Sequence, residues 1–183
     1  GVGFAALTTR QAEALVTLTD GARLRARLVI AADGRASPVR DALGIRAKTT
    51  HYGQKAVVFA VTHDAPHDQV STEVHRTGGP FTLVPLPDKD GRPCSAVVWM
   101  TTGPEAMRLA ALPEDAFNAE ASARSAGLYG PLTLTGRRMV WPIISQIAER
   151  MTGQRTALMA EAAHVVPPIG AQGLNMSLAD LRC

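Results

Sequence analysis

Polar and apolar residues alternate along the first part of the chain, and this pattern predicts a β-hairpin. The alternation runs over residues 12–19 and again over residues 23–30. Asp20 and Gly21 lie between the two runs and supply the chemistry of a tight turn. From residue 28 to residue 32 the second run is continuously apolar. We therefore expect its strand to continue into a sheet that is covered on both faces.

A short helix is predicted after the apolar run, which stops at Asp33 and Gly34. Ser37 suits the N-cap position and Pro38 suits the first helical position. Gly44 suits the left-handed residue that ends a helix. The sequence thus predicts a strand, a glycine turn and a helix in that order.

Beyond residue 50, separate β-type runs predict an antiparallel sheet with helices after it. The strands are expected at 55–62, 70–76, 81–85 and 94–101, with a loop at 87–91. Helices are expected at 104–110 and 113–126, and strand character returns at 133–147 with an interruption at Trp141-Pro142. A buried strand at 156–160 precedes a turn rich in Pro and Gly and then a final helix. These elements predict a mixed α+β fold.

Composition narrows the classes of function. The chain has 183 residues, 46% of them hydrophobic, and its net charge of +3 comes from 19 basic and 16 acidic residues spread along it. The cations are not clustered as a nucleic-acid surface requires. Cys94 and Cys183 lie far apart, which disfavours a disulfide framework and favours a reducing cytoplasm. No apolar run reaches the ~18 residues of a spanning helix, and no signal peptide opens the chain.

The strongest candidate site lies in residues 158–180. A buried strand ends near the acidic Glu161, and a turn rich in Pro and Gly then leads into a helix. Ligands bind at the carboxyl ends of such strands. Gly170 and Gly173 let the backbone approach a flat ligand closely, and the free amides at the helix start supply donors and a partial positive charge.

This stretch resembles the second flavin motif of the single-component FAD-dependent aromatic-ring hydroxylases, and its Gly-Ala-Gln-Gly-Leu-Asn run is most similar to the ubiquinone-biosynthesis branch. The resemblance implies that Glu161 contacts the ribitol of FAD, and that the carbonyl of Pro168 faces the substrate ring. It further implies that the pyrimidine edge of the flavin meets the helix start. The implied cofactor-binding residues of the turn and helix are Gly170, Gln172, Gly173, Leu174 and Asn175. The chain departs from the motif at Ala160 and Glu161, where Gly and Asp are usual.

Residues 31–40 resemble the Asp-Gly fingerprint of the same family. The resemblance places Asp33 and Gly34 near the pyrophosphate of FAD and the NAD(P)H path, and it gives Arg40 the role of holding the loop. We interpret Asp33 as an organiser of the loop. Strands similar to the substrate domain of the family, Gly-Pro-x-x-x-x-Pro-Leu and Val-Trp, lie between the two motifs. The resemblance thus extends over nearly the whole chain.

The resemblance implies a division into domains. Residues 1–48 and 151–183 would form part of a Rossmann-like FAD domain, and residues 49–150 an antiparallel-sheet substrate domain. No Gly-x-Gly-x-x-Gly follows a predicted strand. Both termini look cut, and the dinucleotide-binding motif is missing, so we expect a fragment that is inactive alone and holds FAD weakly or not at all.

Three other groups of residues have structural alternatives. His164 lacks a partner cluster, so a structural role outweighs catalysis. The spacing of His63, His67 and His75 fits no zinc pattern, which favours scattered surface histidines and no metal site. The residues Trp99, Met100, Met139 and Trp141 could line an aromatic pocket but fit plain core better.

The function implied by the resemblance is an FAD-dependent monooxygenase that hydroxylates a phenolic ring with NAD(P)H and dioxygen. The preferred substrate is a polyprenylated ubiquinone precursor. We expect a cytoplasmic protein, and the apolar tail of such a substrate implies peripheral contact with the inner membrane or with a ubiquinone-biosynthesis complex. Two alternatives remain open. One is a hydroxylase of a small soluble aromatic, and the other is a flavin-free binding or assembly subunit.

Overall fold

The computed structural model describes residues 1–168, 170 and 172–182. The chain separates into two compact units, the first formed by Gly1–His51 with Ile144–Cys183 and the second by Tyr52–Ile143. Cys183, whose pairing with Cys94 was disfavoured from the sequence, lies outside the described residues. The assignment of residues 1–48 and 151–183 to a flavin domain and of 49–150 to a substrate domain stays a prediction.

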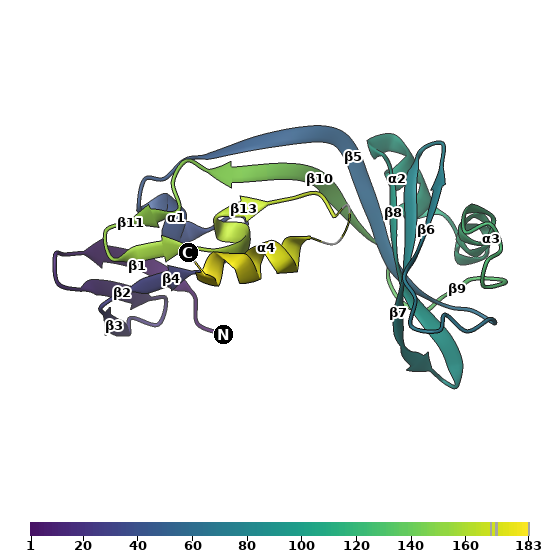
Figure 1. Ribbon diagram of the computed structural model, residues 1–183, viewed down its shortest axis with the longest axis horizontal. Coiled ribbons are helices and arrows are strands. Elements are labelled where there is room, and N and C mark those ends of the chain that lie inside the picture. Colours follow the sequence, from purple (N-terminus) through teal and green to yellow (C-terminus); the bar gives the residue numbers. More distant parts are fainter. Residues whose placement is uncertain (169, 171, 183) are drawn as a thin grey trace. The chain divides into compact units, whose positions relative to one another are not determined.

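The first unit opens with a three-stranded antiparallel sheet (Figure 1). Its strands are β1 (Phe4–Thr9), β2 (Ala14–Leu18) and β3 (Arg23–Ala26), in that spatial order. The predicted hairpin is therefore confirmed as β2 and β3, whereas the sequence reading missed β1. Asp20 Oδ1 accepts a hydrogen bond from the Ala22 amide at 2.9 Å, and this bond closes the turn.

The predicted continuous strand from residue 23 to residue 32 is wrong, because it breaks after Ala26. The chain resumes as β4 (Val29–Ala31), which pairs in parallel with β12 (Thr156–Leu158). β12 also pairs antiparallel with β11 (Thr152–Gly153). One apolar run thus supplies strands to two different sheets, and the break lets the backbone leave the first for the second.

The predicted helix after the glycine turn is present as α1 (Pro38–Ala42). Ser37 Oγ accepts a hydrogen bond from the Arg40 amide at 2.9 Å, as an N-cap does. Gly44 follows with a φ of +63°, the left-handed conformation that ends the helix. The capping residues read from the sequence therefore set both ends of α1.

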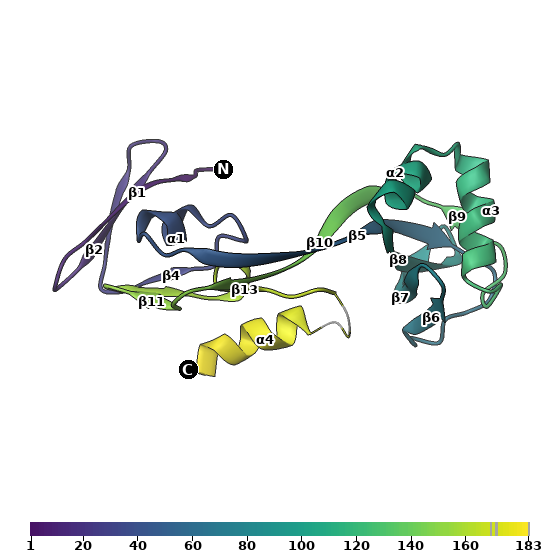
Figure 2. The same cartoon turned by 90° about the horizontal axis from the view of Figure 1, so that it is seen from above.

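The rest of the first unit supports the candidate site. β10 (Met139–Ala148) pairs antiparallel with β13 (His164–Val165), and the 3₁₀ turn η1 (Ala160–Ala162) lies between β12 and β13. α4 (Gly173–Ala179) packs against η1 and continues into η3 (Asp180–Arg182). Figure 2 shows α4 alongside β13. The unit's buried core includes Ala31, Val39, Ile45, Ala148, Leu158 and Ala163.

Two strand predictions here need correction. The strand expected at 156–160 ends at Leu158, because the chain turns into η1. The interruption expected at Trp141-Pro142 is absent, and β10 runs through both residues. Proline lacks an N–H but its fixed φ is compatible with extended backbone, so it does not end this strand.

The second unit is built on an antiparallel sheet in the order β5-β8-β7-β6. Its strands are β5 (Ala47–Thr62), β6 (Thr72–Arg76), β7 (Gly79–Lys89) and β8 (Arg92–Thr102), and β9 (Thr133–Leu134) pairs with β5. β5 begins before the expected residue 55. The loop expected at 87–91 is mostly strand, with its turn only at Asp90 and Gly91, whose φ values are +52° and +75°.

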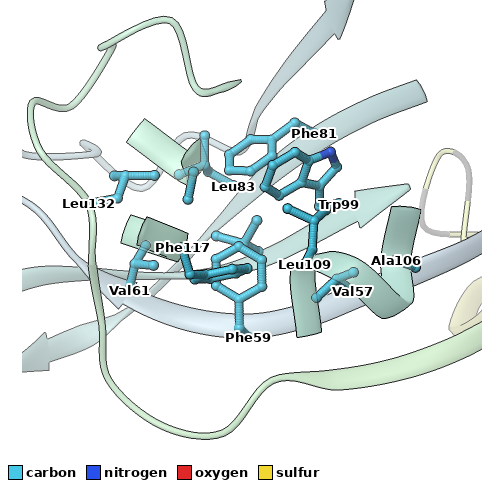
Figure 3. Close-up of a cluster of buried hydrophobic side chains, with 12 residues drawn as sticks. Val57, Phe59, Val61, Phe81, Leu83, Trp99, Ala106, Leu109, Phe117 and Leu132 are labelled. Carbon is cyan, nitrogen blue, oxygen red and sulfur yellow. The ribbon is translucent and has the colours of Figure 1, made fainter. Parts of the chain in front are cut away.

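The core of the second unit is aromatic (Figure 3). The helices α2 (Gly103–Ala111) and α3 (Glu114–Arg124) confirm the two predicted helices. The ring of Phe117 on α3 meets that of Phe59 at 4.8 Å between centroids, edge to face. Trp99, 7% exposed, meets Phe81 in the same way. Trp99 and Met100 are therefore core, as preferred over pocket lining, whereas the core prediction is wrong for Trp141, which is 49% exposed.

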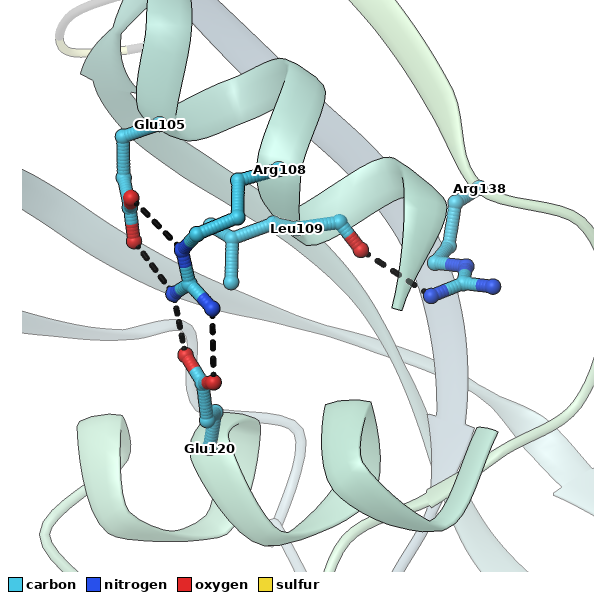
Figure 4. A network of polar contacts seen from close by, with 5 residues as sticks. All are labelled: Glu105, Arg108, Leu109, Glu120 and Arg138. Atoms are coloured by element: carbon cyan, nitrogen blue, oxygen red, sulfur yellow. Dashed lines mark hydrogen bonds and ion pairs between the residues drawn. The ribbon is translucent and has the colours of Figure 1, made fainter. Parts of the chain in front are cut away.

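An arginine on α2 joins the two helices (Figure 4). The Arg108 guanidinium donates hydrogen bonds to Glu105 on its own helix and to Glu120 on α3, at distances from 2.6 to 2.9 Å. These carboxylates raise the pKa of Arg108, and the hydrogen bonds from Arg108 lower the pKa of Glu105 and Glu120. The group is partly exposed, so its contribution to stability is screened by solvent.

The expectation of scattered surface histidines is wrong for His63 and His67, which are 0% and 6% exposed. His63 Nε2 lies 2.9 Å from Ser95 Oγ, and its ring stacks on Tyr129. Burial lowers the pKa of His63. Among the described residues, no three His, Cys, Asp or Glu side chains gather as metal ligands would.

The structure confirms the predicted mixed α+β fold with a mainly antiparallel sheet. Among the residues that the structure describes, no helix has the length and apolar character needed to cross a bilayer.

Candidate functional site

The loop after β4 and the turn after β12 meet in the first unit. Because β4 and β12 are parallel neighbours, their carboxyl ends lie at the same edge of the sheet. Arg35 in the loop forms an ion pair with Glu161 in the turn, with Nε 3.3 Å from Oε2. Both side chains are partly exposed, so the pair orients Glu161 more than it stabilises the fold.

Arg40 forms hydrogen bonds with both the loop after β4 and the turn after β12. Its side chain is 7% exposed, and Nη1 donates to the carbonyl oxygens of Arg35 at 3.0 Å and Ala162 at 3.2 Å. The Nε2 of Gln146 on β10 adds a bond to the Arg35 carbonyl at 3.2 Å. Arg40 therefore connects the loop after β4 to the turn after β12.

Asp33 organises the start of α1. Its Oδ2 accepts a hydrogen bond from the Val39 amide at 3.1 Å. Gly34 follows with a φ of +89°, a conformation that residues with a Cβ rarely adopt. The Asp-Gly pair thus turns the chain from β4 toward α1 and leaves Arg35 facing Glu161.

A groove lies between the turn after β12 and α4. It has a volume of about 270 Å³ and is lined by Glu161, His164, Val165, Val166, Gly173, Leu174 and Ser177. A Cβ on Gly173 would meet nothing within 4 Å, so the backbone there borders open space. The N–H groups of the first turn of α4 have no carbonyl to bond inside the helix. An acidic oxygen and a helix start thus face one groove.

A second hollow of about 360 Å³ shares part of this lining. It adds Lys48 and Thr50 from β5 and Ser145, Gln146 and Ile147 from β10 to the shared residues His164, Val165 and Val166, and Met176 of α4 also lines it. β13 therefore separates two hollows that both reach α4.

The remaining sequence-predicted residues of this motif do not line the groove. Pro168, Gln172 and Asn175 are exposed. Gly170 has a φ of +70°, and the Gln172 side chain donates to its carbonyl at 3.0 Å. Ile169 and Ala171, which belong to the same motif, lie outside the described residues. The roles assigned to these residues toward FAD stay predictions.

Ala160, which stands where glycine is usual, has a φ of +52°. For a residue with a Cβ this left-handed conformation is costly. The turn that presents Glu161 is therefore built for glycine. Alanine in place of glycine at position 160 therefore strains the backbone of this turn.

Sequence reasoning missed two contributors to the site. Arg35 lies within residues 31–40 but was given no role, although its charge is opposite to that of Glu161 in the other motif. Asp180 was not singled out, yet its carboxylate accepts from His164 Nε2 at 2.8 Å and from the Ala160 amide at 2.8 Å. No local sequence pattern predicts these contacts, because Ala160 and His164 lie in segments other than that of Asp180.

Comparison with known proteins agrees with this geometry. Strand ends and a helix start that border one groove are typical of domains that bind a nucleotide cofactor. Residues 6–182 match the family model described as an FAD binding domain. The chain belongs to this family of FAD-binding domains.

Several of the curated relatives are ubiquinone hydroxylases or ubiquinone biosynthesis monooxygenases. The chain is 38% identical over 165 residues to the ubiquinone hydroxylase UbiL of Rhodospirillum rubrum, covering 90% of this chain and 38% of the relative. It is 31% identical over 203 residues to the mitochondrial ubiquinone biosynthesis monooxygenase COQ6 of Xenopus tropicalis, covering 92% and 43%. The chain thus spans well under half the length of these relatives.

Solved structures share the fold. The flavin-dependent halogenase CmlS superposes with a TM-score of 0.78 at 18% identity, over 98% of this chain and 34% of that one. The probable FAD-dependent monooxygenase pqsL of Pseudomonas aeruginosa gives a TM-score of 0.72 at 24% identity, over 97% and 50%. These likenesses support the arrangement of strands and helices described above.

Proposed function

We propose that the whole protein is an FAD-dependent monooxygenase that hydroxylates a phenolic ring, with a polyprenylated ubiquinone precursor as substrate and NAD(P)H and dioxygen as co-substrates. The observation that carries the proposal is the convergence of the two motifs. Arg35 and Arg40 bind the loop after β4 to the turn after β12, and Glu161 then borders the groove beside Gly173. Membership of the FAD-binding family and the ubiquinone hydroxylases among the relatives support the same chemistry.

The acidic Glu161 and the start of α4 border one groove, and this supports binding of the ribitol and ring of FAD there. Bound FAD would supply the redox chemistry, because it accepts a hydride from NAD(P)H and activates dioxygen. Glu161 would accept hydrogen bonds from ribitol hydroxyls, and the amides of Gly173 and Leu174 would donate to the pyrimidine edge. Asp33 and Gly34 would shape the loop near the pyrophosphate. The carbonyl of Pro168 would orient the substrate ring.

The protein's contribution to the reaction is placement and shielding. Fixed amide donors stabilise a negative charge that grows on a bound group, because they need no reorganisation. No nucleophilic side chain is required. The apolar residues Val165 and Val166 between the two hollows would keep water from the reacting atoms.

The cofactor test uses the full-length protein and a matched pair of glutamates. Glu161→Gln should weaken FAD binding, measured by fluorescence titration of the apoprotein. Glu149→Gln is the control, because Glu149 is also about half exposed and paired with an arginine, Arg46, in the same unit. A wild-type protein that purifies colourless and takes up no FAD refutes the proposal and favours a flavin-free binding or assembly subunit.

The substrate test compares a polyprenylated phenol with a small soluble phenol. The proposal expects dioxygen-dependent hydroxylation of the prenylated compound, detected by mass spectrometry. Hydroxylation of the small phenol alone favours the alternative of a hydroxylase of soluble aromatics. Peripheral membrane contact and membership of a biosynthetic complex belong to the same proposal, and co-sedimentation with liposomes tests the first of them.

A further inference from the structure

The carboxylate of Asp180 lies where three segments of the first unit meet. Its Oδ2 accepts hydrogen bonds from the Ala160 amide and from His164 Nε2, each at 2.8 Å, and its Oδ1 lies 3.0 Å from the same nitrogen. Asp180 itself directly follows α4. One side chain therefore connects the end of α4 with η1 and with β13.

The side chains of this cluster are largely shielded from solvent, with 11% of His164 and 24% of Asp180 exposed. A carboxylate only accepts hydrogen bonds, so the hydrogen on His164 Nε2 points at Asp180. His164 is in turn fixed by the pairing of β13 with Ile147 of β10. The sheet thus anchors the histidine, and the histidine anchors the carboxylate.

The hydrogen bond from the Ala160 amide to Asp180 is the contact that affects the groove. Ala160 has a φ of +52°, a conformation that a Cβ disfavours, and its amide points at Asp180. Glu161 follows directly in the chain. If the bond were lost, Ala160 would relax toward negative φ and turn Glu161 away from Arg35 and the groove.

We propose that Asp180 is a positioning residue that holds Ala160 in the left-handed conformation, so that Glu161 and α4 keep their places on the two sides of the groove. The inference rests on the proposed function, because the groove matters as the place of the cofactor. Asp180 itself does not line the groove. It acts through Ala160 and His164.

The test measures FAD affinity of the full-length protein and asks for rescue. Asp180→Ala should weaken FAD binding by roughly tenfold, because two charge-assisted hydrogen bonds are lost together. Adding Ala160→Gly should restore roughly two- to fivefold of the affinity, because glycine keeps a positive φ without the bond. Because Ala160→Gly alone should also raise the melting temperature, the rescue is judged on the FAD affinity of the folded protein, which a gain in stability alone does not change.

Arg155→Ala provides the matched control. Arg155 donates to the carbonyl of Gln11 at 2.9 Å and lies in the first unit, away from the groove. Its removal should lower the melting temperature and leave the FAD affinity unchanged. If Asp180→Ala lowers only the melting temperature as well, the proposal is overturned.

A conservative variant covers the case in which Asp180→Ala does not fold. Asp180→Asn keeps one acceptor oxygen but turns a donor toward His164, so a smaller loss of roughly two- to threefold and the same rescue are expected. Absence of both in the folded variant overturns the proposal. A wild-type protein without FAD affinity refutes the proposed function and this inference with it. Normal FAD affinity in both Asp180 variants refutes this inference alone.

Discussion

Replacing Ala160 with glycine should stabilise the protein, although glycine usually destabilises a folded chain. An L-residue in the left-handed region costs roughly 1–2 kcal/mol relative to its ordinary conformation. Against this, glycine costs about 0.5–1 kcal/mol through its greater freedom in the unfolded chain. Ala160 has a φ of +52°, so both terms apply there. The expected net change is a gain of about 0.5 kcal/mol in the free energy of unfolding.

Ala162 supplies the matched control in the same 3₁₀ turn. It is 0% exposed and is not among the residues with positive φ. Ala162→Gly therefore removes a buried methyl and adds freedom to the unfolded chain, and it relieves no left-handed conformation. The expected loss is roughly 1–2 kcal/mol. The two variants make the same chemical change and should shift stability in opposite directions.

Thermal unfolding of the apoprotein measures both variants. FAD is left out, because a ligand that binds only the folded state would raise the melting temperature by itself. A change of 1 kcal/mol corresponds to roughly 2–4 °C in a chain of this size. Equal losses in the two variants would refute the left-handed conformation of Ala160, and with it the reason given for glycine in this turn.

Three further predictions concern the second unit. Phe117→Ala should lower the free energy of unfolding by roughly 3–5 kcal/mol in chemical denaturation, because Phe117 is 0% exposed in the aromatic core. Gly79→Ala should reduce the folded yield and the melting temperature, because a Cβ would lie 2.4 Å from the Met100 carbonyl oxygen at a φ of +124°; a wild-type melting temperature would contradict the tight approach. Burial lowers the pKa of His63 below its ordinary 6.5, so the unfolded chain binds more protons and stability should fall as the pH drops through 6.5 toward the folded pKa. His63→Gln should flatten this dependence in melting curves between about pH 7 and 5, and an unchanged slope would contradict the assignment.

Local signals in the sequence predicted the elements whose stability is local. Ser37, Pro38 and Gly44 defined α1, because capping depends on neighbouring residues. The Asp20-Gly21 turn defined the hairpin for the same reason. By contrast, the break between β3 and β4 depends on β12, the distant partner of β4, which no local pattern reveals.

The candidate site divides in the same way. The two motifs were found from their order along the chain and from a family resemblance, and Glu161 indeed borders the groove. The contacts of Asp180 were missed, because a carboxylate in a helix says nothing about the segments that it will meet. The buried state of His63 was missed too, since Ser95 satisfies its ring nitrogen from another strand.

The parallel pairing of β4 with β12 bears on the order in which the chain becomes structured during synthesis. Val29–Ala31 cannot pair until Thr156–Leu158 has been translated. The residues of the second unit, Tyr52–Ile143, form one uninterrupted stretch of the chain. Pairings between remote segments form slowly, because the entropy of closing a long loop precedes any gain from contact. The inserted unit can therefore fold before Thr156–Leu158 has been translated, whereas the pairing of β4 with β12 forms only afterwards.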